Sequence, residues 1–338
     1  MTSSAGTAIE RRSMLLEEFF EPKILIVSGK GGVGKTTVAA ALAILAAKTG
    51  QRVCIAEVDD KGTLPAIFGA SDLDYEPREM CPGIWGMRII PEAALAEYLN
   101  VQYHMKRISK IFTSTQFVDY ITTAAPGLKD ILILGKVWYL EQERTASRTF
   151  DTIVVDAPAA GHMLTFLSAP GGLSDAIRVG PLRRQAEWLV QMLRDPKRAR
   201  VHLVTLPEEM PVSETLETSR TLAEQLDIGQ GPVFANAVYT DLFTSQEEEK
   251  LKGSVDRAVL VEEGSAVGLA LEDEDIDALM AYARFLSSRR GIQETHLKKL
   301  RAGTQQPVIE LPFLFSAGLA LPDVENLADV IEEKVQKS

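Results

Sequence analysis

The residues of this sequence best suited to chemistry are the nine that read Gly-Lys-Gly-Gly-Val-Gly-Lys-Thr-Thr from position 29. They match G-x-x-x-x-G-K-[ST], the phosphate-binding P-loop. Glycines allow backbone N–H groups to turn toward one anion, and the positive end of a following helix attracts the same charge. An ordinary glycine-rich turn is the alternative interpretation. We predict a nucleotide site that contains Gly29, Lys30, Gly31, Gly32, Val33, Gly34, Lys35, Thr36 and Thr37.

The polar side chains of this loop have distinct expected roles. Lys35 would neutralise the β- and γ-phosphates, and the Thr36 hydroxyl would hold Mg²⁺. Thr37 should add a contact to the α-phosphate. Lys30 is a second lysine within the loop, which either contacts phosphate or only adds positive potential. The expected cofactors are therefore ATP and Mg²⁺.

Two carboxylates stand at the ends of predicted strands. The segments 52–59 and 150–156 are apolar runs that end in Asp59 and Asp156. The carboxyl ends of parallel strands face the ligand crevice. Asp156 is therefore predicted to hold Mg²⁺, whereas Asp59 would orient the attacking water or contact the metal. The alternative for Asp59 is an acid that caps a turn.

An amide and a histidine are further candidates. Asn236 lies near the end of the predicted strand 232–238, where its amide could pair with the edge of adenine. A turn asparagine is the alternative. His162 follows Asp156 in a short loop, either as a residue that moves with the γ-phosphate or as a polar helix start. The other histidines share no metal-ligand spacing.

The surrounding pattern predicts an α/β fold. A branched apolar strand, 23–28, precedes the loop, and an alanine-rich helix, 38–48, follows it. Further strand and helix patterns alternate along the chain, which indicates a doubly wound, mostly parallel sheet within one P-loop NTPase domain, 1–338. Helical insertions are expected at 91–148 and 241–303. We expect turns at 72–82, a Gly/Pro link after 163–167, and a helix from an N-cap at Ser213 to Leu226.

Composition excludes several classes of protein. The formal net charge of the 338 residues is −11, which argues against general affinity for nucleic acid or anionic membranes. The sequence has neither a membrane-spanning apolar run nor the pattern of a signal peptide, so we expect a cytoplasmic protein. Cys54 and Cys81 lie in unlike settings, so neither a disulfide nor a zinc site is expected.

Several motifs together resemble one family, that of the arsenite-pump (ArsA) and tail-anchored-protein-targeting (GET) ATPases, over nearly the whole chain. The loop has the deviant form GKGGVGKTT, shared with MinD, ParA and nitrogenase-iron-protein ATPases. Residues 156–167 are similar to the switch II pattern D-T-A-P-T-G-H-T-L-R-F-L. Residues 59–64 occupy the place of the switch I pattern D-P-A-H-[SN]-L but keep only its first and last residues. Three other matches are Pro207-Glu208-Glu209 with Glu214-Thr215, the adenine-reading Asn236, and Leu311-Pro312-Phe313-Leu314.

The resemblance implies an ATP-hydrolysing dimeric switch of the ArsA/GET type. By this resemblance, Lys30 of this chain would reach the nucleotide of a partner subunit, and Pro312 and Phe313 would face the base. A homodimer, or a heterodimer with a related ATPase chain, would couple hydrolysis to an anion pump or to a membrane-protein or hydrophobic client. Two features depart from the family: the cysteines for zinc or arsenite are absent, and there is one P-loop where the pump has two. A MinD/ParA-like positioning ATPase and a regulatory subunit are the alternatives.

Overall fold

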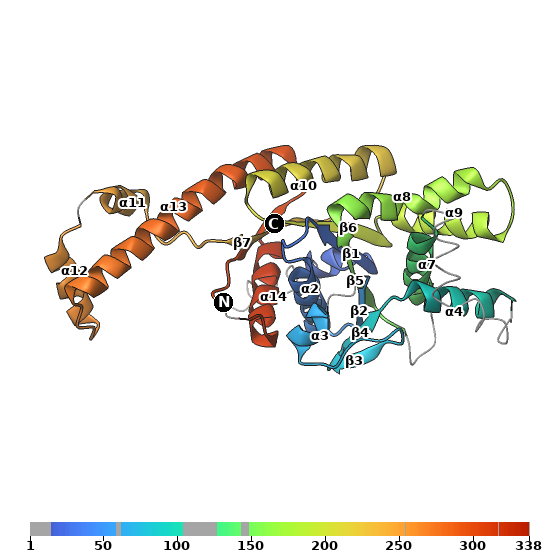
Figure 1. Ribbon diagram of the computed structural model, residues 1–338, viewed down its shortest axis with the longest axis horizontal. Coiled ribbons are helices and arrows are strands. Elements are labelled where there is room, and N and C mark those ends of the chain that lie inside the picture. Colours follow the sequence, from blue (N-terminus) through green and yellow to red (C-terminus); the bar gives the residue numbers. More distant parts are fainter. Residues whose placement is uncertain are drawn as a thin grey trace, which may run out of the picture.

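The computed structural model describes residues 15–58, 62–103, 127–142, 149–253, 255–316 and 318–337, except the side chains of 101–103 and 252. Eight strands form one sheet in the order β3-β4-β2-β5-β1-β6-β7-β8 (Figure 1). All neighbouring strands are parallel except β3 and β4. The predicted doubly wound α/β fold is thus confirmed. The strands are β1 Ile24–Gly29, β2 Val53–Glu57, β3 Arg78–Cys81, β4 Ile84–Arg88, β5 Thr152–Ala159, β6 Ala199–Thr205, β7 Val233–Val238 and β8 Val308–Pro312.

The P-loop strand β1 lies between β5 and β6, and all six of its residues are buried. Its side chains alternate between two cores, as a strand covered on both faces requires. Leu25 and Val27 belong to the core on the side of α2 Lys35–Lys48 and α14 Leu321–Val335. Ile24 and Ile26 belong to the opposite core. That second face is covered by α7 Leu128–Gln142, α8 Ala160–Ala176 and α9 Pro181–Arg194.

Three local expectations were wrong. Residues 72–82 include β3, a short edge strand that pairs antiparallel with β4 across a turn at Gly83, where φ is +84°. The expected Gly/Pro link is helical, because α8 continues through a buried Pro170 while it packs on α9. Packing has overridden local propensity there. Helix α10, Glu209–Thr221, begins before Ser213. The Ser213 hydroxyl bonds back to the Glu209 carbonyl at 2.8 Å, so Ser213 does not cap the helix.

Most of the remaining helices lie within the two ranges expected to be helical. Helix α4, Pro91–Tyr103, and α7 lie beside the sheet; residues 104–126 and 143–148 lie outside the described residues. Helices α11 Ser245–Lys252, α12 Arg257–Ala266 and α13 Asp273–Gly303 form an arm that extends away from the sheet (Figure 1). The base of α13 packs on α10 and β7, and Leu297 and Leu300 are fully buried there. Whether either range is a separable insertion stays a prediction.

Among the described helices, none combines the length and apolar character needed to cross a membrane.

Candidate nucleotide site

The loop between β1 and α2 packs closely against other backbone and side-chain atoms at its two ends. A Cβ on Gly29 would lie 2.0 Å from the Val204 carbonyl oxygen of β6. Gly34 is the N-cap of α2, with φ +93°, and a Cβ there would lie 2.2 Å from Nδ2 of Asn236. Around Gly31 and Gly32, in contrast, the described chain leaves open space. The loop is thus tightly fitted at its two ends and open in the middle.

The start of α2 is arranged to receive an anion. In the described part of the chain, no side chain caps the first N–H groups of this helix, and its first turn contains no acid. Uncapped N–H groups and the helix dipole together favour a negatively charged ligand. Lys35 is buried, and its amine donates to the Lys30 carbonyl at 3.3 Å, so it folds back over the loop. Thr37 is also buried in this first turn.

The side chain of Thr36, in the first turn of α2, contacts that of Asp156 on β5. The Thr36 hydroxyl donates to Oδ2 of Asp156 at 2.6 Å. Asp156 is paired in register with Val27, and its side chain is buried. A carboxylate oxygen beside a threonine hydroxyl suits Mg²⁺, which prefers oxygen ligands and usually keeps several waters. The arrangement fits a metal held jointly with phosphate oxygens.

Lys30 points to a different element. Its amine lies 2.6 Å from Oε1 of Glu214 on α10. The side chains of both residues are more than a third exposed, so solvent screens the pair and it contributes little to stability. In this conformation the second lysine of the loop is held by an internal carboxylate.

Asn236 lies beside the P-loop. Its Nδ2 donates to the Val33 carbonyl at 2.9 Å, which leaves the amide oxygen and the second N–H for another partner. Ala237 follows with a positive φ of 55°. Beyond it, Tyr239 stacks on Phe313, with ring centroids 4.9 Å apart and planes within 13°. Pro312 ends β8, and the Phe313 N–H donates to the Val238 carbonyl at 2.9 Å.

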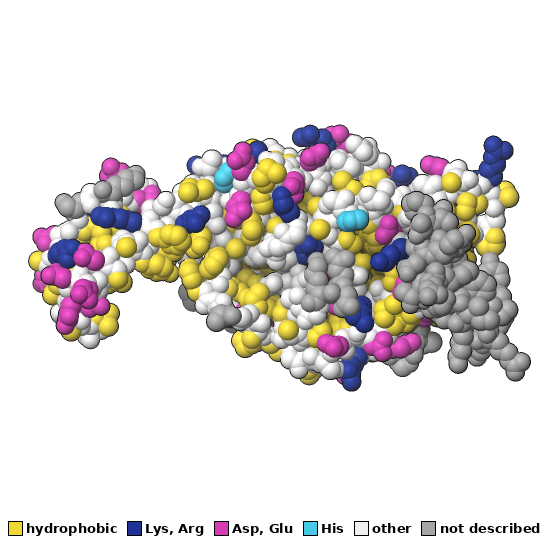
Figure 2. Space-filling view, viewed as in Figure 1, with side chains coloured by type: hydrophobic (Ala, Val, Ile, Leu, Met, Phe, Trp, Pro, Cys, Tyr) yellow, Lys and Arg dark blue, Asp and Glu magenta, His cyan; other side chains and the backbone are white. Residues whose placement is uncertain are grey.

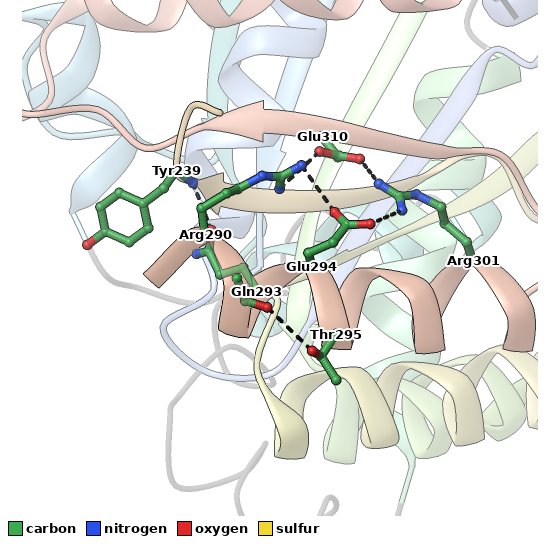
Figure 3. A network of polar contacts seen from close by, with 8 residues as sticks. Tyr239, Arg290, Gln293, Glu294, Thr295, Arg301 and Glu310 are labelled. Carbon is green, nitrogen blue, oxygen red and sulfur yellow. Dashed lines mark hydrogen bonds and ion pairs between the residues drawn. The ribbon is translucent and has the colours of Figure 1, made fainter. Parts of the chain in front are cut away.

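A polar network ties the base of α13 to these strand ends (Figure 3). Gln293 accepts from the Tyr239 N–H at 2.8 Å and donates to the Ala237 carbonyl at 2.9 Å. Nearby, Arg290 lies 3.1 Å from Glu294 and 3.6 Å from Glu310. Arg301 pairs with the same two acids. The arm is therefore hydrogen-bonded to the segment that carries Asn236.

The other candidates have varied surroundings. Asp59 lies outside the described residues, so its placement stays a prediction. His162 is exposed in the first turn of α8. Burial raises the pKa of Asp130 on α7, and the neighbouring His162 and Lys129 oppose that shift. Cys54 is fully buried in β2, and desolvation raises the pKa of its thiol to about 12.

Sequence reasoning did not assign roles to three residues of this region: Glu214, Tyr239 and Gln293. Glu214 belongs to a matched family motif, but nothing in the pattern connected it with Lys30. Tyr239 directly follows the predicted strand of Asn236, and that position was a usable signal for an aromatic neighbour of the base. Gln293 lies in a charged helical stretch with no motif.

Comparisons with known proteins point to one class. Residues 22–186 match the family described as "Anion-transporting ATPase". The chain is 31% identical over 341 residues to the ATPase BagA of Mycobacterium tuberculosis, with 98% of each chain covered.

Two arsenical pump-driving ATPases share a shorter region. That of Escherichia coli is 27% identical over 218 residues, which cover 60% of this chain and 37% of the pump protein. That of Acidiphilium multivorum is 28% identical over 222 residues, with the same two coverages.

Proposed function

The chain belongs to the ArsA family of ATPases, and from this premise we propose that its P-loop end is a nucleotide-driven switch that couples Mg-ATP hydrolysis to a partner or cargo. The observation that carries the proposal is the 2.6 Å contact between the Thr36 hydroxyl and Asp156. It joins the start of a P-loop helix to a carboxylate on the neighbouring strand β5, and a metal–triphosphate site needs both groups.

The roles of the residues follow from their positions. Lys35 would leave the Lys30 carbonyl to bind the β- and γ-phosphates, and the N–H groups of the loop and of Thr37 would surround the phosphate chain. Asn236, Pro312 and Phe313 would contact the base. Thr36 and Asp156 would hold Mg²⁺, whose positive charge would stabilise the phosphate groups. Asp59 would orient the attacking water.

The switch is proposed to work as a dimer. Lys30 would reach the nucleotide of a second copy, or of a related ATPase chain, and it must then leave Glu214. An exposed ion pair contributes about 0–1 kcal/mol, so a phosphate group competes easily for this lysine. γ-Phosphate would hold the two switch segments closed, and its loss would release them.

The surface supports a hydrophobic client or partner. Figure 2 shows hydrophobic side chains gathered where the arm joins the sheet. Apolar patches of this kind usually mark interaction sites. The client interpretation rests on this surface and takes no support from the nucleotide site. Exposed apolar residues of the arm and of the neighbouring loops are Leu242, Val259, Val261, Val267, Leu269, Leu279, Tyr282, Phe285, Ile292, Phe313, Phe315 and Leu319.

Two alternatives make different predictions. A MinD/ParA-like positioning ATPase requires ATP-dependent binding to vesicles or DNA, against which the net charge of −11 argues. A regulatory subunit would bind nucleotide and turn it over only beside a related ATPase chain; the altered residues 60–63 favour that alternative.

Steady-state ATPase assays test the proposal. We expect Lys35→Ala to abolish turnover, and Asp59→Asn to retain ATP yet turn over at least ~100-fold more slowly, because one water-positioning group is lost. Lys299→Ala on α13, whose amine bonds the Ser213 hydroxyl at the surface, is the matched lysine control. Wild-type turnover in Lys35→Ala would refute the assignment of the site.

A further inference from the structure

A cavity lies between α4, α7 and α9, and it shares no residue with the nucleotide site. Its volume is about 300 Å³, at the lower end of the range for small-molecule pockets. The nucleotide-site proposal leaves it unexplained. The described residues that line it include Ala94, Glu97, Leu132, Lys136, Trp138, Arg184, Gln185 and Trp188.

Aromatic rings form much of the lining. Trp138 on α7 and Trp188 on α9 stack with centroids 5.3 Å apart and planes within 8°. Trp188 remains 42% exposed although it is a large apolar side chain. Two of the chain's three tryptophans thus line one cavity. Flat aromatic surfaces of this kind favour flat apolar ligands.

Two of the charged groups in the lining neutralise each other. Lys136, with a side chain only 3% exposed, places its amine 2.8 and 2.9 Å from the two carboxylate oxygens of Glu97. The Tyr75 hydroxyl donates to the same carboxylate. A buried lysine is tolerated when it is paired in this way. This pair contributes no net charge to the cavity.

Besides the hydroxyls of Tyr98 and Tyr139, the remaining polar groups are a guanidinium and an amide. Arg184 and Gln185 line the cavity, and within the described part of the chain neither side chain has a hydrogen-bonding or ionic partner. The adjacent Arg183, in contrast, pairs with Glu187 at 2.7 Å. Arg184 stands one helical turn before Trp188 on α9, so the positive charge lies beside the aromatic wall. The cavity therefore has an excess of positive charge.

We propose that this cavity binds a small organic anion with a flat apolar body. The apolar part would contact the lining formed by Trp138, Trp188 and Leu132. A carboxylate or a similar monoanionic group would accept from Arg184, whose planar guanidinium suits carboxylate geometry, and from the Gln185 amide. This site does not depend on the proposed nucleotide chemistry. An apolar side chain of a client protein is the competing occupant, and it would not need the anionic group.

Two isosteric probes separate these occupants in the full-length protein. Naphthalene-2-carboxylate is anionic, and naphthalene-2-carboxamide has the same shape without the charge. Titrations would be followed by calorimetry and by the fluorescence of Trp138 and Trp188. We expect one saturable site that binds the carboxylate at least about tenfold more tightly, because a hydrogen bond to a charged group exceeds a neutral one. Equal affinities, or no saturable binding up to millimolar probe, would overturn the proposal.

Variants locate the site. Arg184→Leu should remove the preference for the carboxylate and leave the affinity for the carboxamide within about twofold. Trp188→Leu should weaken the binding of both probes. Arg220→Leu on the exposed face of α10 removes the same charge away from the cavity and should change neither affinity. If Arg184→Leu keeps the full preference, or if Arg220→Leu abolishes it, the anion is bound elsewhere and the assignment is wrong.

Discussion

The amine of Lys30 lies 2.6 Å from the Glu214 carboxylate of the same chain, and 184 positions separate the two residues. This contact occupies the lysine that the family resemblance assigns to a partner's nucleotide. The structure thus has Lys30 in an intramolecular pair, which competes with any intermolecular role. The pair's partial exposure keeps the competition weak.

Removing the internal carboxylate should therefore promote assembly. We expect Glu214→Gln to lower, by up to about fivefold, the concentration of a nonhydrolysable ATP analogue needed for dimerisation, since an exposed pair contributes about 0.2–1 kcal/mol. Lys30→Ala should abolish the shift. Sedimentation with Mg²⁺ and either the analogue or ADP measures both effects. Glu217→Gln removes the same charge one turn along α10 and is the control. If Glu214→Gln weakens assembly as Lys30→Ala does, Glu214 orients the lysine and does not compete for it.

Asp156 should be needed for binding of Mg²⁺ more than for binding of the nucleotide. We expect Asp156→Asn to lower turnover at least about 100-fold, because a positioned metal contributes several kcal/mol to such reactions. ATP affinity measured with EDTA should stay within about twofold of wild type. The increase in ATP affinity that Mg²⁺ gives the wild type should disappear in the variant. Asp151→Asn, which precedes the same strand and accepts the Arg52 N–H, should resemble wild type. Normal Mg²⁺ dependence in Asp156→Asn would remove this residue from the metal site.

Residues adjacent in sequence made the P-loop predictable, because a strand, four glycines and a helix start specify one another locally. The approach of Asp156 to Thr36 was also predictable, although 120 positions separate them. Parallel strands bring their carboxyl ends to one edge, so an acid in the carboxyl-terminal half of a strand can be placed without knowing its exact neighbours.

Contacts between helix surfaces and loops were not predictable in this way. The pairing of Lys30 with Glu214 depends on how α10 is rotated over the sheet. The bonds of Gln293 to Ala237 and Tyr239 depend on where α13 crosses β7. Local signals were also overridden: α8 continues through Pro170 because its buried residues pack on the sheet and on α9. In each case the deciding interaction is tertiary.

Gln293 should support binding of the base in particular. Its two hydrogen bonds hold Ala237 and Tyr239 immediately after Asn236. We expect Gln293→Leu to weaken ATP affinity at least about fivefold, because each of the two lost bonds costs roughly 0.5–1.5 kcal/mol. The turnover number and the affinity for inorganic tripolyphosphate, which has no base, should change little.

The control for this experiment is Thr295→Ala, which removes only a hydroxyl bonded to the Gly291 carbonyl within α13 (Figure 3). Gln293→Glu should fall between wild type and Gln293→Leu, since it can accept from Tyr239 but cannot donate to Ala237 when ionised. An equal loss of tripolyphosphate affinity would show that Gln293 supports the P-loop as a whole and not the base.

His202 should make the fold sensitive to acid. It lies fully buried in β6 between Phe19 and Phe234, with Nδ1 3.3 Å from the Pro232 carbonyl. Burial is the largest cause that lowers its pKa to about 4; the carbonyl contact opposes this shift and Arg200 adds to it. The unfolded chain protonates His202 near its ordinary pKa of 6.5. Between about pH 6.5 and pH 4 the unfolded chain therefore binds a proton that the folded chain does not, so stability falls as pH falls.

Replacement of this histidine should flatten that dependence. Wild type and His202→Leu would be unfolded with urea at several pH values, and the difference between their free energies of unfolding compared. From pH 8 to 7 the difference should change by only about 0.1–0.2 kcal/mol, because His202 is neutral in the folded protein and largely neutral in the unfolded chain. From pH 6.5 to 4 the wild type should lose stability relative to the variant, by up to about 1.4 kcal/mol of unfolding free energy per pH unit. Because other titrating groups are common to both proteins, they cancel in this difference. A difference that stays constant down to pH 4 would mean that His202 is protonated in the folded protein as readily as in the unfolded chain.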